Sequence, residues 1–195
     1  MEPVKPSSAD PANPALELLL QRRSNHRLRA PGPSADELES IVAAALRVPD
    51  FGHLRPFRFL IAQGEGLDRL GQAMQRAAIA AGQPRSVIAR TPRMPHRAPL
   101  VIVAVSSPKP DPVVPLFDQQ LCAASTVLTM QLAARALGYS GVWRSGWLMH
   151  DRHLHRELQL NDSEQIVGFL YLGTPVPIGE PEPAVESPHD YLSWL

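Results

Sequence analysis

The sequence predicts an α+β sandwich in which helices cover both faces of a sheet. Short runs of aliphatic and aromatic residues, typical of strands, occupy residues 57–62, 100–105 and 165–173, and helical patterns separate them. The expected order of helices and strands is not the regular alternation of a doubly wound fold. At 195 residues and 44% hydrophobic composition, the chain has the size and apolar content of one domain.

The first helical pattern covers residues 15–23. Leu16, Leu19 and Leu20 share one face, and the two arginines at its end suit the negative end of a helix dipole. A turn is expected at residues 24–33.

The second helix begins at Ser34, where the hydroxyl and Glu37 three residues later form a capping-box pattern, and Pro49 ends it. Its expected inward stripe consists of Leu38, Ile41, Val42 and Ala45.

Three further helices are expected at residues 67–81, 116–137 and 153–158. The longest ends at Gly138, and its small residues allow another backbone to approach closely, as in a central or interface helix. Residues 84–99 contain four prolines and several basic residues, so they are expected to form a surface excursion that holds no regular element for long.

Composition argues against several classes of protein. Nineteen basic and nineteen acidic residues give no net charge, so nothing draws the chain to nucleic acid or an anionic membrane. The single cysteine, Cys122, excludes an internal disulfide and is compatible with the cytoplasm. Residues 1–14 carry no secretory signal and are expected to be a flexible arm, whereas the apolar stretch 121–138 is too short to span a membrane.

No side chain is identified as a catalytic group. His150, His153 and His155 match no common zinc spacing and are interpreted as an exposed polar helix, with metal-dependent hydrolysis as a distant alternative. Cys122 lies among apolar helix residues, where a thiol is usually inert. The turn around Gly64 lacks the remaining features of a dinucleotide-binding fingerprint and is interpreted as a strand-to-helix turn.

Two short motifs suit a bound cofactor. Arg22, Arg23 and Ser24 combine two guanidinium groups with a hydroxyl, which can bind a phosphate monoester; the alternative is charge at a helix end. In the stretch 138–148, glycines flank Trp143, Arg144 and Ser145, and backbone there can lie against a flat ligand; the alternative is a strand-end turn with a packed Trp.

Together these stretches resemble the nitroreductase family. The similarity is carried in order by ALELLLQRRSNHRL, LRVPDFGHLRPFRFLIAQGEG, GYSGVWRSGWL and QIVGFLYLGTP, and it covers residues 15–175 as a single domain. It implies a nitroreductase-like sandwich with a central, mostly antiparallel sheet and a homodimer that binds FMN. Such a protein takes hydride from NAD(P)H by a ping-pong mechanism and reduces a small acceptor, such as a nitroaromatic or a quinone. The flavin carries the chemistry.

The resemblance also assigns roles to the motifs. Arg22, Arg23 and Ser24 match the residues that hold the FMN phosphate and ribityl chain, whereas Trp143, Arg144 and Ser145 match those over the flavin ring.

Arg47 and Phe51 fall in the block that, in the family, reaches the flavin of the partner subunit. The alternative interpretation is that Arg47 neutralises a helix dipole and that Phe51 is an ordinary core residue. His26 stands where many members have a cation near the flavin, or is a solvent-facing turn residue. His53 and Arg55 replace the usual Asn and Gln of this block, which motivates an alternative function, a flavin- or anion-binding protein without NAD(P)H turnover.

The chain end is expected to contact a partner subunit. Residues 176–195 are rich in proline and finish in Tyr191, Leu192, Trp194 and Leu195, side chains that bury large apolar areas. With the long apolar helix, this pattern predicts an obligate homodimer that has its flavin sites at the subunit interface.

Overall fold

The computed structural model describes residues 13–177 and 187–195, so the expected arm at residues 1–14 lies almost entirely outside the described residues. Its core is a five-stranded sheet in the order β1-β5-β3-β2, with β4 also pairing with β5, and every pair is antiparallel. The strands are β1 (Leu28–Arg29), β2 (Phe57–Gln63), β3 (Leu100–Ser106), β4 (Ser140–Arg144) and β5 (Gln165–Pro175). The predicted α+β sandwich with a mostly antiparallel sheet is confirmed.

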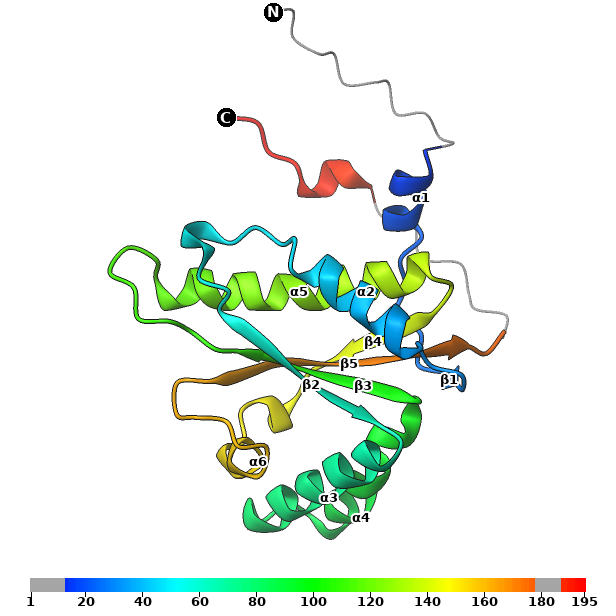
Figure 1. The fold of residues 1–195 in the computed structure, drawn as a ribbon, viewed down its shortest axis with the longest axis vertical. Helices are drawn as coiled ribbons and strands as arrows, with labels where there is room; N and C mark the ends of the chain where they lie inside the picture. Colours follow the sequence, from blue (N-terminus) through cyan, green and yellow to red (C-terminus); the bar gives the residue numbers. More distant parts are fainter. Residues whose placement is uncertain (1–12, 178–186) are drawn as a thin grey trace, which may run out of the picture.

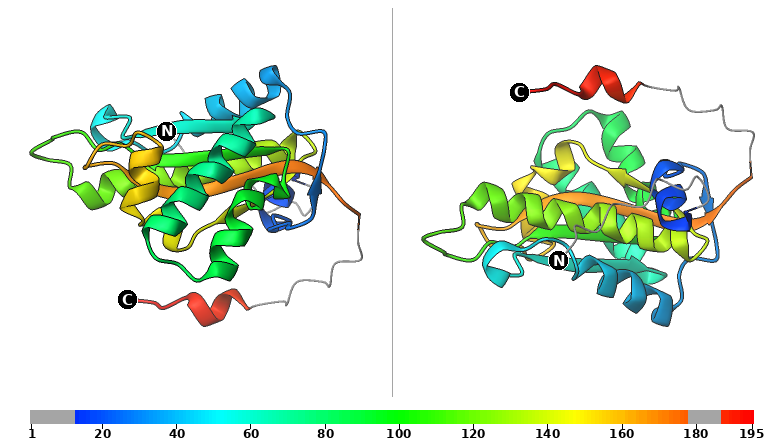
Figure 2. Two further views of the ribbon diagram at one scale, coloured as in Figure 1. Left: turned by 90° about the horizontal axis from the view of Figure 1, so that it is seen from below. Right: turned by 90° about the horizontal axis from the view of Figure 1, so that it is seen from above.

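Helices cover the sheet in two layers. Figure 1 shows α2 and α5 above the sheet and α3, α4 and α6 below it, and the two views of Figure 2 show the same separation. The helices are α1 (Pro14–Leu20), α2 (Ala35–Ala45), α3 (Glu65–Ala80), α4 (Arg85–Arg90), α5 (Leu116–Ala136) and α6 (Arg152–Glu157). Short 3-10 turns are η1 (Phe51–His53), η2 (Thr91–Arg93), η3 (Pro95–Arg97), η4 (Trp147–Met149) and η5 (Pro188–Tyr191).

The β3 strand is buried on both faces, which explains its uninterrupted apolar sequence. Alternate side chains point to opposite sides of the sheet. Leu100 and Ile102 belong to the core between the sheet and the layer of α2 and α5. Val101 and Val103 belong to the core between the sheet and the layer of α3 and α6. One continuous run of residues therefore supplies both cores.

The capping box of α2 forms as expected. The Ser34 hydroxyl accepts from the Glu37 backbone N–H, and the Glu37 carboxylate accepts from the Ser34 N–H. Tyr139 also donates to Glu37, at 2.8 Å, and these hydrogen bonds hold the pKa of that carboxyl below its usual range. Of the expected inward stripe, Ile41 and Ala45 are buried.

The prediction for residues 84–99 was wrong in part. The prolines do limit each element, but the segment forms α4 and the two turns η2 and η3, and Thr91 and Pro95 are buried. These turns pack on α3, where Gly71 lies so close to the Pro92 backbone that a side chain would not fit. This segment is a wall of the lower layer rather than a surface excursion.

The sequence did not indicate β1, which lies in the expected turn 24–33. Leu28 and Arg29 pair with the end of β5, and the Val176 N–H donates to the Arg27 carbonyl at 3.1 Å. Two residues carry no strand periodicity, so only the neighbouring β5 reveals this strand.

Two segments expose apolar side chains. The first is α1, which has no buried residue and ends at Leu20, before the arginines that were expected to close it. The second is the chain end at residues 187–195, which stands clear of the sheet in Figures 1 and 2, with Trp194 92% exposed. Neither segment contributes to the core of its own chain.

Candidate functional site

A cavity of about 410 Å³ lies at the end of β4, on the face of the sheet that carries α3. Most of its wall is aromatic or aliphatic, its cationic side chains are arginines, a histidine also lines it, and no carboxylate does. The lining includes His26, Met74, Arg90, Trp143, Arg144, Ser145, Trp147 and Tyr171. The predicted Trp143-Arg144-Ser145 motif and His26 therefore meet in one cavity.

The indole of Trp143 lies against Gly168 of β5. A Cβ on Gly168 would come within 2.7 Å of Trp143 Cδ1, so only glycine leaves room for the ring. Trp143 Nε1 donates to the Val167 carbonyl at 3.2 Å. Packing and the hydrogen bond together fix the ring against β5, on the side of the sheet that carries α5.

Arg144 is held on two sides but keeps one donor unused. Its Nη2 lies 3.2 Å from Nδ1 of His26, and its guanidinium lies 5.3 Å from the ring centre of Tyr171. Burial raises the pKa of Tyr171, so that ring remains a neutral phenol. The Nε of Arg144 is buried without a hydrogen-bond partner, and a buried unsatisfied donor in a native fold calls for a ligand or another explanation.

Arg90 enters the cavity from α4, and no sequence motif pointed to it. It lies in the proline-rich segment, which the close contact between Gly71 and Pro92 packs against α3. The side chains of Met74 and Met94 complete this wall. The basic residues of the segment were visible in the sequence, but their direction was not.

The segment that contains Arg22, Arg23 and Ser24 runs beside β4. The Asn25 N–H donates to the Gly141 carbonyl at 3.0 Å, which attaches the segment to the open edge of the strand. Arg23 lines a second cavity of about 350 Å³, whereas Arg22 and Ser24 line neither cavity. The motif is therefore divided, with one arginine in a cavity and its neighbours outside it.

The block around Phe51 projects from the chain instead of entering its own cavity. Phe51 is 70% exposed and Arg47 is exposed, so Phe51 is not an ordinary core residue. Both His53 and Arg55 adopt positive φ, a costly conformation for these residue types. The Asp50 carboxylate accepts from the Arg55 N–H at 2.8 Å and helps to hold this turn.

A profile of the Nitroreductase family matches residues 19–174. The chain belongs to the nitroreductase family. It is 40% identical over 161 residues to "Putative NAD(P)H nitroreductase YdjA" of Escherichia coli K12, which covers 83% of this chain and 88% of that protein.

Solved structures share the fold of this nitroreductase-family chain at lower identity. The nitroreductase-like family protein of Bacillus cereus has a TM-score of 0.78 at 19% identity, covering 96% of this chain and 99% of that one. A nitroreductase of Bacteroides fragilis, solved with bound FMN, has a TM-score of 0.72 at 20% identity, covering 90% and 96%. These likenesses confirm the nitroreductase-like fold.

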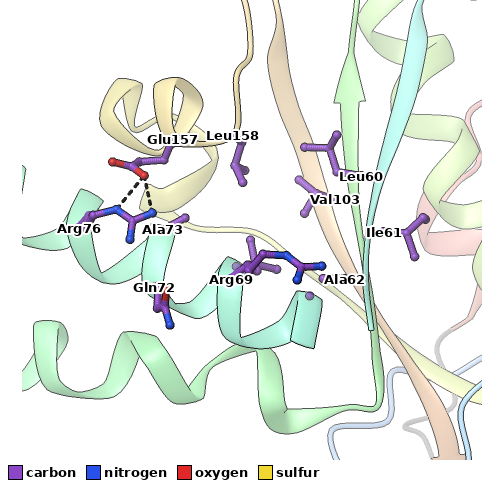
Figure 3. A pocket seen from close by; sticks show the side chains of 12 residues that line it. Leu60, Ile61, Ala62, Arg69, Gln72, Ala73, Arg76, Val103, Glu157 and Leu158 are labelled. Carbon is purple, nitrogen blue, oxygen red and sulfur yellow. Dashed lines mark hydrogen bonds and ion pairs between the residues drawn. The ribbon is translucent and has the colours of Figure 1, made fainter. Parts of the chain in front are cut away.

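Another cavity of this nitroreductase-family chain contains none of the predicted site residues. It measures about 460 Å³ and lies between β2, α3 and α6, where Arg76 pairs with Glu157 at 2.7 Å (Figure 3). Its apolar wall consists of Leu60, Ala62 and Val103, with further aliphatic residues from the helices. Gly66, beside the turn that the sequence analysis interpreted as a strand-to-helix turn, lines it, but no predicted cofactor-binding residue does, and the cavity is not part of the candidate site.

The interpretation of the histidine cluster as an exposed polar helix was wrong for His155. His155 is buried, its Nε2 lies 2.8 Å from the Met149 carbonyl, and its Nδ1 lies 3.0 Å from Nη1 of Arg152. Burial lowers its pKa, so the ring is a neutral core group that supports η4. Its neighbour Glu164 is also buried and accepts both donors of Arg58, at 2.6 and 2.8 Å.

Other chemistry finds little support in the structure. Within residues 13–177 and 187–195, no group of three or more His, Cys, Asp or Glu side chains is arranged to hold a metal, and no helix is long and apolar enough to cross a membrane. The Cys122 thiol is buried in α5, and burial raises its pKa, which disfavours the nucleophilic thiolate.

Proposed function

We propose that the chain is an FMN-dependent oxidoreductase that takes hydride from NAD(P)H by a ping-pong mechanism and reduces a small nitroaromatic or quinone. The observation that carries the proposal is the unsatisfied, buried Nε of Arg144 in an aromatic cavity. The relatives named as NAD(P)H nitroreductases and the FMN-bound neighbour support it. We also propose a cytoplasmic location, with which a chain that has a single cysteine and forms no internal disulfide is compatible.

The residues of the cavity fit a flavin. An isoalloxazine ring is flat and has hydrogen-bond acceptors along one edge, which suits an aromatic wall that includes Trp147 and Tyr171, with a spare arginine donor. The exposed Ser145 hydroxyl and the open backbone at Gly146 lie at the same strand end. Bound FMN supplies the hydride acceptor and donor chemistry, and the protein binds and orients it.

Two cations in the cavity bear on how easily the flavin is reduced. Arg144 and Arg90 bring positive charge to the cavity, and no carboxylate of the lining offsets it. Positive charge favours the anionic form of a reduced cofactor. We therefore assign this charge to the two arginines.

We assign the rest of the flavin site to a second subunit. Along α5, Phe117, Leu121 and Leu128 follow one outward stripe, and they are 66%, 51% and 43% exposed. Such a stripe is typical of an interface, and obligate dimers bury more than about 2,000 Å². Phe51, on its fixed turn, and the exposed Trp194 at the chain end are further side chains for the partner.

The test is a visible absorption spectrum of the purified chain, reconstituted with FMN and desalted, before and after anaerobic addition of NADPH or NADH. We expect oxidised-flavin absorbance that either nucleotide bleaches and that a quinone restores. A sample that stays colourless contradicts the FMN assignment. A yellow sample that neither nucleotide bleaches supports instead the alternative, a flavin-binding protein without turnover.

A variant connects the spectrum to the cavity. Replacing Arg144 by Gln removes a charged donor, and hydrogen bonds to charged groups contribute about 1.5–3 kcal/mol, so FMN should bind about 10- to 150-fold more weakly. The matched control is Arg156→Gln, because Arg156 is an exposed arginine whose Nη2 lies beside Nδ1 of His153, outside this cavity. Equal FMN affinities for the two variants would remove Arg144 from the site.

A further inference from the structure

The side chain of Arg90 lines the proposed flavin cavity at the end of β4 and has no partner there. It is exposed, and within residues 13–177 and 187–195 it forms no hydrogen bond and no ion pair. Arg144 in the same cavity, by contrast, lies against His26 and Tyr171. The guanidinium of Arg90 therefore keeps all its donors available to a ligand.

The turn that follows α4 sets the position of Arg90. Thr91 is buried, and its hydroxyl donates to the Ile88 carbonyl at 2.8 Å. The next residue, Pro92, packs on Gly71 of α3. The last turn of α4 is thus held on α3, and the base of the Arg90 side chain is held with it.

The segment around Arg90 is basic throughout. Residues 85–97 contain four arginines, one histidine and no acidic residue. Burial raises the pKa of Tyr171, and the positive charges of Arg144 and Arg97 oppose that rise, so Arg97 also acts on the cavity. No carboxylate lines the cavity. Positive charge that is not balanced locally attracts anionic molecules and speeds their association.

The wall beside Arg90 suits an aromatic ring. It includes Met74 of α3 and Met94, which lies between η2 and η3. Methionine side chains adapt to the shape of a ligand, and their sulfur atoms make favourable contacts with aromatic rings. The spare donor of Arg144 and the Ser145 hydroxyl lie at the end of β4, where we assign the flavin. The wall from α3 and α4 is therefore left for the electron acceptor.

We propose that Arg90 selects acceptors that carry an anionic group, of the class of aromatic carboxylates. The proposal rests on the function proposed above and names the substrate class of the same cavity. The ring of the acceptor packs on Met74 and Met94, and its carboxylate accepts hydrogen bonds from the Arg90 guanidinium. The planar fork of arginine matches the two oxygens of a carboxylate.

Two other roles of Arg90 compete with this one. Arg90 is the last residue of α4, and a cation there offsets the partial negative charge of the helix end. The phosphates of NAD(P)H are a second source of negative charge. Neither role distinguishes a charged acceptor from a neutral one of the same shape.

The experiment measures binding of benzoate and benzamide to the oxidised, FMN-loaded chain by isothermal titration calorimetry. The two molecules share a ring and differ in charge, and the flavin reduces neither, so a changed flavin potential does not affect the result. Wild-type protein should bind benzoate at least about 5-fold more tightly than benzamide, and added salt should weaken benzoate binding alone. Arg90→Gln should weaken benzoate about 5-fold and benzamide less than about 2-fold.

The matched control is Arg85→Gln. Arg85 is an exposed arginine of the same helix that does not line the flavin cavity, so its loss removes the same charge from α4. This variant should keep the wild-type preference for benzoate. Arg90→Lys should keep part of it, because the charge remains but the planar fork does not.

Each outcome decides between the explanations. Wild-type protein without a preference for benzoate, or equal benzoate binding by Arg90→Gln and Arg85→Gln, overturns the proposal. If Arg90→Gln slows reduction of the flavin by NADPH or NADH and leaves benzoate binding unchanged, Arg90 binds the nucleotide and the proposal is also overturned. A purely structural role would weaken both ligands alike.

The failure of this inference can be told from the failure of the proposed function. A chain that holds no FMN overturns both. A chain that holds FMN and reduces 4-nitrobenzoate and 4-nitrobenzamide with equal kcat/KM keeps the proposed function and overturns the selection by Arg90 alone.

Discussion

Gly168 of β5 should be intolerant of any side chain, because it faces the indole of Trp143. A Cβ at this position lies within 2.7 Å of Trp143 Cδ1 and 3.0 Å of Cε2, closer than real Cβ contacts allow. The backbone at Gly168 is not left-handed, so the clash is the only obstacle to alanine. The Gly168→Ala variant must therefore displace the ring.

The cost follows from two lost features. Overpacking costs about 1–3 kcal/mol in a core and falls toward the low end here, because Trp143 is 37% exposed and can shift; the Trp143–Val167 hydrogen bond contributes about 1 kcal/mol. The free energy of unfolding should fall by about 1–3 kcal/mol, which lowers the Tm by about 2–12 °C for a chain of this size. Because Trp143 lines the proposed flavin cavity, FMN affinity should fall as well.

Thermal and chemical unfolding would measure this change, with Gly66→Ala as the matched control. Gly66 lies in α3 with no contact below 3.7 Å, so alanine there should be neutral or stabilising by up to about 1 kcal/mol. Adding Trp143→Leu to Gly168→Ala should recover part of the loss, since the ring no longer clashes. A Gly168→Ala variant as stable as the wild type would refute the reasoning.

Three further predictions concern pH and assembly. Arg58 holds the pKa of Glu164 at about 2, so the pair stabilises the fold above pH 4.5, and this contribution disappears as the pH falls toward 2. Glu164→Gln should lower the free energy of unfolding by about 1–3 kcal/mol at pH 7, allowing for the partial exposure of Arg58. A loss that does not shrink in acid would contradict this prediction. Burial lowers the pKa of His155, so the free energy of unfolding should fall as the pH drops below about 6.5. In the His155→Gln variant, the free energy of unfolding measured in urea should depend less on pH between pH 7.5 and 5.5. Leu121→Asp should separate the proposed dimer in sedimentation experiments and Arg69→Gln should not; identical sedimentation of the two variants would argue against an α5 interface.

Local sequence patterns were sufficient for most of the fold. The Ser34 capping box, the length of α5 and the buried β3 strand each depend on neighbours in the chain, and all three formed as expected. The motif Trp143-Arg144-Ser145 also lies at the end of one strand, so its meeting with a cavity could be anticipated. The two-residue β1 escaped because so short a strand has no pattern of its own, and α4 escaped because prolines interrupt its segment.

Residues from distant segments could not be assembled in this way. Arg90 looked like one more basic residue of a proline-rich stretch until the packing of Pro92 on Gly71 directed it to the flavin cavity. Arg135 looked like an ordinary charge at a helix end until Gln21 held it beside Arg23.

By itself, then, the sequence determined the family, the layered fold and the strand motif, because these follow from periodicity and from residues that are neighbours in the chain. The tertiary structure alone decided that His155 is a buried neutral group, that Arg22 and Arg23 separate, and that two unassigned arginines enter the cavities. The physical reason is that side-chain direction and burial depend on long-range packing, which no local pattern encodes.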